Sequence, residues 1–196
     1  MELNMQNNLI LASASPRRRQ LLTDLGVSFS IISADIDEAV LINEQPADYV
    51  SRLALQKAQK ILSANEYSVV LGADTCVVVD QEILGKPESQ DDALQMLLSL
   101  SGRWHQVLTA VAVISKDRIR QVLVSTEVEF CHLDEQVCNA YWQTNEPQDK
   151  AGSYAIQGIG GRFVRQIKGS FSAVVGLPVA ETAELLSAFE VDFWKF

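Results

Sequence analysis

The order of apolar and polar residues in the first part of the chain predicts short strands that alternate with helices. An apolar run at residues 9–12 is typical of a buried strand. Ser15 can cap a helix, Pro16 suits its first turn and Gly26 can end it, so a helix of roughly ten residues follows. Residues 46–64 carry apolar side chains at helical spacing and predict a second, longer helix.

The rest of the pattern predicts further strands, including a long antiparallel pair. Residues 105–115 and 118–133 alternate over two long stretches that are joined at Lys116-Asp117. Further strands are predicted at 27–33, 68–72 and 76–79, and further helices from Ser89 to near Gly102, at 134–143 and at 178–189. These elements predict an α/β fold with a mixed central sheet flanked by helices and an antiparallel lobe. We expect one domain over residues 1–196, with two lobes around a cleft.

Composition and charge narrow the classes of function. The chain has 196 residues, of which 47% are hydrophobic, and this suits one globular unit with a core. A net charge of −9 argues against general binding to nucleic acid or anionic membranes, while a local cationic cluster still permits a small anionic ligand. The start of the chain does not resemble a signal peptide, and no apolar run has membrane-spanning length. Three cysteines without a CxxC pair are typical of free thiols in a reducing cytoplasm.

The first candidate site is the basic start of the first helix, where Ser13 precedes Pro16, Arg17 and Arg18. A helix N-terminus binds anions through its backbone N–H groups, and arginine forks match phosphate oxygens. The glycines and the Lys-Ser/Thr pair of a Walker P-loop are absent. The alternative is a capped helix with a solvated basic turn.

Acidic residues form two more candidates. Asp74 follows an apolar run, where a parallel strand would present its carboxyl end to a ligand, although an aspartate that begins a turn is common. Asp35, Asp37 and Glu38 could hold Mg²⁺ together with substrate phosphates, and a solvated acidic loop is the alternative.

Other polar residues stand out by their positions. Lys57 falls on the apolar stripe of the helix at 46–64, and its spacing favours a lysine that snorkels at the edge of that stripe. Gln157 lies in the glycine-rich stretch 149–158 and offers the donor and acceptor that reading a base edge requires, although an ordinary tight loop is the alternative. The two histidines, His105 and His132, are expected to be structural, and the aromatic tail (Phe189, Phe193, Trp194 and Phe196) to dock on the body or on a partner subunit.

Taken in order, these motifs resemble those of the Maf family of nucleoside triphosphate pyrophosphatases over essentially the whole chain. The matching segments are SASPRR at 13–18, DIDE at 35–38, RLALQKA at 52–58, GADT at 72–75, LGKP at 84–87, LSGRWHQVLTAV at 100–111 and DKAGSYAIQG at 149–158. The resemblance implies cleavage of a nucleoside triphosphate between its α and β phosphates, to give the monophosphate and pyrophosphate. It also implies a divalent cation (Mg²⁺ or Mn²⁺), a fold related to inosine triphosphate pyrophosphatases, and a cytoplasmic homodimer.

By position, the resemblance implies a role for each motif residue. Asp74 resembles the family's catalytic proton acceptor, and Glu38 with Asp74 its metal position. The positions that match its triphosphate-binding residues are Ser13, Arg17, Arg18, Lys57 and Lys86. The residues at the positions that set substrate specificity match the subgroup that prefers dTTP and UTP, not the one that prefers 7-methyl-GTP. These residues are Arg17, Thr75 and Gln157.

Two other classes of function stay open at this stage. A nucleotide kinase or phosphatase would release ADP or inorganic phosphate, and the missing Walker motif argues against the kinase. A nucleotide-binding regulator of cell division or septum formation would bind without turnover. The presence of Asp74 and Lys86 favours the enzyme over the regulator. For the enzyme, removal of modified pyrimidine nucleotides is a further expected role.

Overall fold

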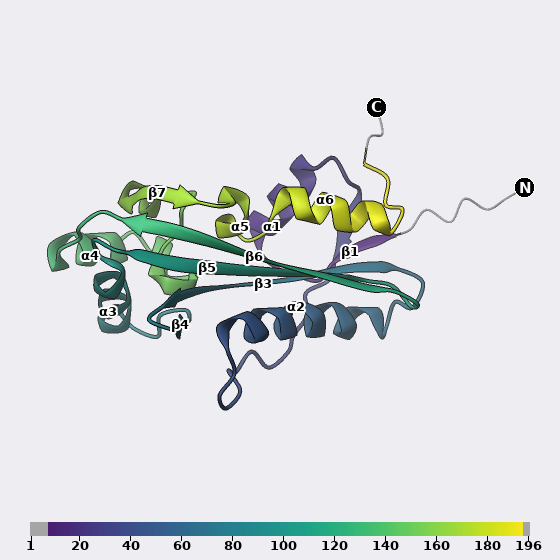
Figure 1. The fold of residues 1–196 in the computed structure, drawn as a ribbon, viewed down its shortest axis with the longest axis horizontal. Coiled ribbons are helices and arrows are strands. Elements are labelled where there is room, and N and C mark those ends of the chain that lie inside the picture. Colours follow the sequence, from purple (N-terminus) through teal and green to yellow (C-terminus); the bar gives the residue numbers. More distant parts are fainter. Residues whose placement is uncertain (1–7, 194–196) are drawn as a thin grey trace, which may run out of the picture. The chain divides into compact units, whose positions relative to one another are not determined.

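The computed structural model describes residues 8–193 and has a mixed α/β fold (Figure 1). Its strands are β1 (Leu9–Leu11), β2 (Phe29–Ile31), β3 (Val69–Val79), β4 (Glu82–Leu84), β5 (Trp104–Ile114), β6 (Ile119–Phe130) and β7 (Val164–Lys168). Its α-helices are α1 (Pro16–Asp24), α2 (Pro46–Leu62), α3 (Gln90–Leu100), α4 (Glu135–Trp142), α5 (Phe171–Val175) and α6 (Val179–Ala188). Three short 3-10 helices, η1 (Glu146–Asp149), η2 (Ala151–Ser153) and η3 (Ile159–Phe163), lie between α4 and β7.

The strands form one mixed sheet in the order β2-β1-β3-β5-β6-β7, with β4 paired to β3. β1 runs parallel to both neighbours, so that Leu9 lies opposite Phe29 on one side and Val69 on the other. β3 with β4 and β6 with β7 are antiparallel pairs. The predicted mixed sheet with flanking helices is therefore confirmed.

The chain divides into two compact units, each described below by itself. Unit 1 comprises the described residues of Met1–Asp74, Thr109–Leu123 and Gly176–Phe196, and unit 2 comprises Thr75–Leu108 and Val124–Val175. The long strands β3, β5 and β6 contribute residues to both. The expectation of one domain with two lobes around a cleft stays a prediction.

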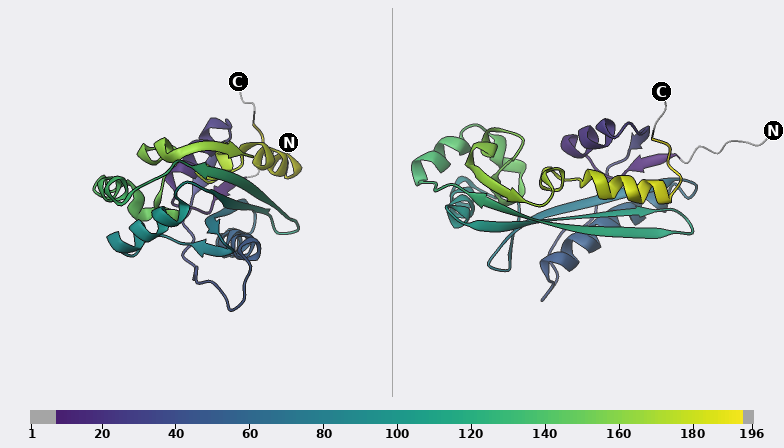
Figure 2. Two further views of the ribbon diagram at one scale, coloured as in Figure 1. Left: turned by 60° about the vertical axis from the view of Figure 1, so that its left-hand side comes forward. Right: turned by 45° about the horizontal axis from the view of Figure 1, so that its top comes forward.

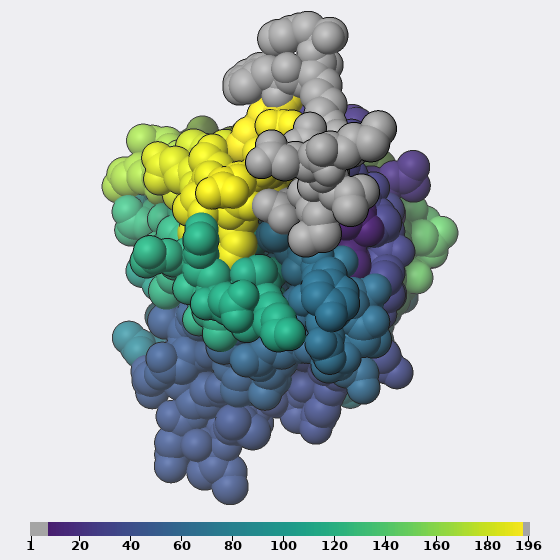
Figure 3. All heavy atoms as spheres, turned by 90° about the vertical axis from the view of Figure 1, so that its right-hand side faces the viewer, coloured from purple at the N-terminus to yellow at the C-terminus, as the bar shows by residue number. Residues whose placement is uncertain are grey.

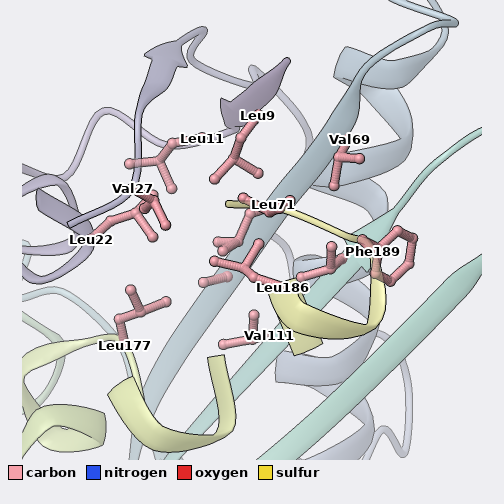
Figure 4. Close-up of a cluster of buried hydrophobic side chains, with 13 residues drawn as sticks. Leu9, Leu11, Leu22, Val27, Val69, Leu71, Val111, Leu177, Leu186 and Phe189 are labelled. Carbon is pink, nitrogen blue, oxygen red and sulfur yellow. The ribbon is translucent and has the colours of Figure 1, made fainter. Parts of the chain in front are cut away.

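In unit 1, the strands present alternate side chains to two different layers, because successive side chains of a strand point to opposite faces. Leu9, Leu11, Leu71 and Val111 join a buried cluster with Leu186 of α6 (Figure 4). Leu22 of α1 belongs to the same cluster. α2 lies on the other side of β3, as the views in Figures 1 and 2 show.

The layer between α2 and β3 depends on Gly72. A Cβ atom at this position would lie 2.2 Å from the carbonyl oxygen of Ala54 and 2.8 Å from the backbone nitrogen of Ala58. Only glycine allows a backbone to approach so closely. The approach brings the α2 residue before Ala58, which is Lys57, to the face of β3 that carries Asp74.

In unit 2, an aromatic cluster forms the core. Phe130 makes edge contacts with His105, Tyr154 and Phe163, and Tyr141 of α4 packs on Phe163. The phenylalanine and tyrosine rings belong to a buried cluster that includes Val77 of β3 and Leu97 of α3. Rings in such edge-to-face pairs stabilise the fold by more than the burial of their surface alone.

Several predicted elements differ from those observed. Residues 73–75 do not separate two strands, because β3 runs unbroken from Val69 to Val79. The predicted strand at 27–33 is only Phe29–Ile31, since its single neighbour β1 has just three residues to pair with. In the aromatic tail, Phe189 is buried against the body and Phe193 packs on the same cluster, while Trp194 and Phe196 lie outside the described residues.

Other expectations can be compared with the described residues. Cys76, Cys131 and Cys138 are free thiols, of which Cys76 and Cys138 are buried. No helix in residues 8–193 has the length and apolar character that crossing a membrane requires. The segment between β2 and α2 projects at the lower left of Figure 3, and its residue Ile42 is 94% exposed.

Candidate active site

The N-terminus of α1 combines a capped first turn with basic side chains. Ser15 caps the helix, since its side chain accepts a hydrogen bond from the backbone N–H of Arg18, and Pro16 occupies the first turn. The Ser13 hydroxyl, which is buried, accepts hydrogen bonds from the Ser15 N–H and from Arg18 Nη1. No acidic residue lies in the first turn, so the partial positive charge of the helix end keeps its full effect.

Arg18 is held in place by the backbone. Its Nε donates to the carbonyl oxygen of Gly176 at 2.8 Å, and its Nη1 reaches Ser13 Oγ at 3.4 Å. Burial lowers the pKa of Arg18, although Asp74 opposes that effect. An arginine stays charged even so, so Arg18 presents a fixed, partly desolvated cation beside the helix end.

A buried ion cluster lies on the α2 side of β3. Lys57 Nζ lies 2.7 Å from Asp74 Oδ1 and 2.7 Å from Glu38 Oε1. Lys57 and Asp74 are each 7% exposed, whereas Glu38 lies on the exposed segment before α2. The expectation that Lys57 snorkels is therefore wrong, because its side chain is buried and its charge is compensated by the buried Asp74 and by Glu38, whose side chain is 46% exposed.

Asp74 owes its environment to the length of β3. β1 ends at Leu11, opposite Leu71, whereas β3 continues to Val79. Asp74 thus lies beyond the carboxyl end of β1 while its own strand goes on, and it does not begin a turn. Burial raises its pKa, against the lowering effects of Lys57 and Arg18. A carboxylate with a raised pKa is a better proton acceptor than an ordinary aspartate.

The segment that carries Glu38 is tied to α2. Arg52 forms two close contacts with Glu44, Nε to Oε1 at 2.6 Å and Nη2 to Oε2 at 2.7 Å, and it also donates to the carbonyl oxygen of Ala39. The Tyr49 hydroxyl donates to the carbonyl oxygen of Glu38. These bonds hold the backbone at Glu38 although the segment is largely exposed.

Sequence reasoning missed the residues that support this site. Arg52 stands in the quoted RLALQKA motif without a role, and its place five residues before Lys57 on α2 was the available signal. The Gly176 carbonyl carried no such signal, since backbone acceptors are the same in every residue.

Unit 1 brings together six of the predicted residues, and unit 2 contains the other three. Ser13, Arg17, Arg18, Glu38, Lys57 and Asp74 belong to unit 1. In unit 2, Lys86 follows β4 and is exposed, Thr75 is half-buried in β3, and Gln157 is exposed. Asp35 and Asp37 are exposed, and the Asp37 carboxylate accepts a bond from the N–H of Ala39.

The chemistry of Glu38 and Asp74 fits a divalent cation bound jointly with phosphate oxygens. Their carboxylates converge on one point, which the Lys57 ammonium occupies here. Across the part of the chain that the structure describes, no group of three or more His, Cys, Asp or Glu side chains could hold a metal ion. Mg²⁺ usually takes one or two carboxylates together with substrate phosphates, so a two-carboxylate set is of the right kind.

A cationic helix end beside a buried acid has the chemistry that an anionic, phosphate-bearing ligand requires. In a comparison with known proteins, the family described as Maf-like protein matches residues 8–189. The chain belongs to the Maf family.

Relatives share this sequence over nearly its full length. A dTTP/UTP pyrophosphatase of Pseudoalteromonas atlantica is 58% identical, over 91% of this chain and 95% of that one. Proteins of the same name from Vibrio parahaemolyticus (54%, over 93% and 97%) and Hahella chejuensis (49%, over 97% and 96%) are also similar. Among solved structures, the Ham1 protein of Staphylococcus aureus aligns with 63% of this chain and 71% of its own, with a TM-score of 0.48 at 14% identity.

Proposed function

We propose that this protein is a nucleoside triphosphate pyrophosphatase that hydrolyses dTTP and UTP to the monophosphate and pyrophosphate. The observation that carries the proposal is Asp74, a buried acid with a raised pKa in contact with Lys57. The cationic N-terminus of α1 adds a place for phosphate oxygens in the same unit. The substrates are taken from the relatives, which carry the name dTTP/UTP pyrophosphatase at 49–58% identity.

The reaction follows from the groups that the chain supplies. Asp74 accepts a proton from a water molecule as the water oxygen bonds to the α-phosphorus. The bond from that phosphorus to the oxygen bridging the α and β phosphates breaks, and pyrophosphate leaves with the electron pair. Arg17, Arg18, Lys57 and Lys86 stabilise the negative charge that builds on it, and such electrostatic stabilisation carries most of phosphoryl transfer.

Glu38 and Asp74 would hold Mg²⁺ or Mn²⁺ together with the phosphates. When bound, the cation withdraws charge from the phosphate oxygens. In the structure, the Lys57 ammonium contacts both carboxylates and offsets one of their two negative charges. With a divalent cation on Glu38 and Asp74, the Lys57 ammonium would be available to bind a phosphate oxygen.

Arg17, Thr75 and Gln157 are proposed to select the substrate. A glutamine amide donates and accepts, as the edge of a uracil or thymine base requires. The proposal includes a cytoplasmic homodimer, and removal of modified pyrimidine nucleotides as its use in the cell.

A product assay tests the reaction and the substrate together. The purified protein is incubated with dTTP, UTP, CTP, GTP, ATP and 7-methyl-GTP in the presence of Mg²⁺ or Mn²⁺, and the products are separated by anion exchange. We expect monophosphate and pyrophosphate from dTTP and UTP. Release of inorganic phosphate would contradict the reaction, and turnover of 7-methyl-GTP alone would contradict the assignment of Arg17, Thr75 and Gln157. Binding without turnover would favour the regulator of cell division instead.

A further inference from the structure

Glu146 in unit 2 makes an unusual set of contacts with the segment that follows Gln157. Its Oε2 accepts a hydrogen bond from the N–H of Ile159 at 2.9 Å, and its Oε1 accepts one from the N–H of Gly160 at 2.9 Å. The same Oε1 accepts the hydroxyl of Tyr141 at 2.7 Å. One carboxylate thus receives three donors, two of them backbone groups at the start of η3.

Tyr141 extends this arrangement to the other side of Gln157. Its hydroxyl oxygen accepts a hydrogen bond from the N–H of Ala155 at 3.1 Å. Tyr141 itself lies in the aromatic core, 3% exposed, and its ring packs edge-on against Phe163. Backbone bonds on both sides of Gln157 therefore lead to one buried phenol and the carboxylate that it contacts.

The glycines of this segment fit the two side chains. A Cβ at Gly158 would lie 2.1 Å from Glu146 Oε2, and one at Gly160 would lie 2.5 Å from the Tyr141 hydroxyl oxygen. Each glycine thus leaves the space that one of the polar groups fills, because any larger residue would displace it. This steric evidence is independent of the hydrogen bonds and points to the same pair.

The charges agree with a fixed carboxylate. Burial opposes the charged form of Glu146, yet the bonds from Gly160, Tyr141 and Ile159 prevail and lower its pKa. Burial, and then the bond to Glu146, raise the pKa of Tyr141, so its hydroxyl keeps its proton. The pair is therefore a carboxylate that accepts and a phenol that donates throughout the neutral range.

These contacts fix the backbone that carries Gln157. Residues 152–155 are buried, whereas Gln157 is exposed. Its direction is set by the backbone at Ala155 and Gly158–Gly160. That backbone is what Tyr141 and Glu146 hold.

We infer that Glu146 and Tyr141 are positioning residues for base selection, which hold the backbone around Gln157 so that its amide meets the edge of a pyrimidine base. The inference rests on the proposed function, in which Gln157 reads the base. Neither residue touches the substrate, and both act through the hydrogen bonds to Ala155, Ile159 and Gly160.

The test compares Glu146→Gln and Tyr141→Phe with the wild-type protein, using UTP and GTP as substrates. The amide of Glu146→Gln replaces one accepting oxygen with a donor that faces a backbone N–H. Tyr141→Phe keeps the ring and loses both hydroxyl bonds. For each variant we expect KM for UTP to rise about tenfold, with kcat nearly unchanged and the preference for UTP over GTP reduced about tenfold. Exposed residues supply matched controls, Glu135→Gln and Tyr67→Phe, which should leave these values as they are.

A double-mutant cycle with Gln157→Ala separates positioning from a general structural role. If Glu146 acts through Gln157, then Glu146→Gln has no further effect on selectivity in the Gln157→Ala background, whereas independent effects multiply. Equal losses for UTP and GTP, a fall in kcat alone, or multiplied effects would overturn the inference.

The same data distinguish this inference from the proposed function. If wild-type protein releases pyrophosphate with UTP preferred, and Gln157→Ala reduces that preference while Glu146→Gln and Tyr141→Phe do not, the positioning role is wrong and the proposed function stands. If the wild-type protein releases no pyrophosphate from any triphosphate, the proposed function fails and the inference fails with it. Thermal unfolding of each variant excludes loss of folded protein as the cause.

Discussion

The two regions that carry the candidate chemistry are each stabilised by a different kind of interaction. In unit 1, Lys57, Asp74 and Glu38 are fixed by contacts between charged side chains, two of them almost fully buried. In unit 2, the segment around Gln157 is fixed through its backbone, by Glu146 and Tyr141, and its own side chain stays exposed. The first arrangement shifts the pKa of a carboxylate, and the second orients an amide side chain.

This difference follows from what each task requires. Proton transfer needs a carboxylate whose pKa is shifted, and burial raises the pKa of Asp74 although the neighbouring cations Lys57 and Arg18 act to lower it. Reading a neutral base needs a donor and an acceptor at a defined place, which an exposed amide on a rigid backbone provides. Changes in the two regions should therefore have effects of different kinds.

The largest effect is expected for Asp74→Asn, which removes the proton acceptor and keeps the shape. We expect kcat for UTP to fall about 10³-fold, within the range that general-base catalysis contributes. The amide cannot take the proton, while Lys57 keeps its contact with Glu38, so the fold is retained. Product analysis by anion exchange and thermal unfolding measure the two quantities.

Asp80→Asn is the matched control for this variant. Asp80 lies just past the end of β3, is exposed, and pairs with Arg103 on the surface. Its loss should leave kcat and the unfolding temperature nearly unchanged, because exposed ion pairs contribute little. Activity retained in Asp74→Asn would show that another group accepts the proton.

An intermediate effect, on the free energy of unfolding at low pH, is expected from the protonation of His105. This residue lies among the uncharged side chains in the core of unit 2. Burial lowers its pKa from 6.5 to about 4, its Nε2 contacts the Tyr154 hydroxyl, and its Nδ1 has no hydrogen-bond partner among residues 8–193. The unfolded chain binds a proton near pH 6.5 and the folded chain only near pH 4. The contribution to stability is thus full above pH 6.5 and is lost as the pH falls through 4, by about 3 kcal/mol in total.

Urea unfolding at pH 7 and at pH 4 measures this contribution. His105→Gln cannot take up the proton, so its free energy of unfolding should depend less on pH in this interval than that of the wild-type protein. His132→Gln is the matched control, since His132 is exposed. An unchanged pH dependence in His105→Gln would mean that other groups dominate acid unfolding.

The smallest effect is expected for Gly72→Ala, which adds one methyl group between α2 and β3. The new Cβ would meet the backbone of Ala54 and Ala58, which have to move apart. We expect unfolding to become easier by about 2 kcal/mol, as overpacking usually costs, and kcat to fall because Lys57 moves with α2. In Gly85→Ala the added atom meets nothing within 4 Å, so its stability should stay near that of the wild-type protein. Equal stability of the two variants would contradict the close approach.

Some parts of the site were predictable because they depend on neighbours in the chain. The capped N-terminus of α1 follows from Ser15 and Pro16, whose effects reach only three or four residues. The helix at 46–64 follows from apolar spacing, and α2 spans Pro46–Leu62. The role of Lys57 was not predictable in the same way, because spacing places a residue on a helix face but does not show what lies opposite.

The sequence by itself determined the longer helices, the mixed α/β class and, through ordered motifs, the family. Only the tertiary structure decided that β3 runs unbroken through Asp74, that Lys57 is buried between two carboxylates, and that Glu146 holds the backbone beyond Gln157. The physical reason is the separation along the chain over which each effect acts. Caps, turns and periodicity act over a few residues, whereas a pKa shift or a close backbone approach depends on groups that folding brings together from distant parts of the chain.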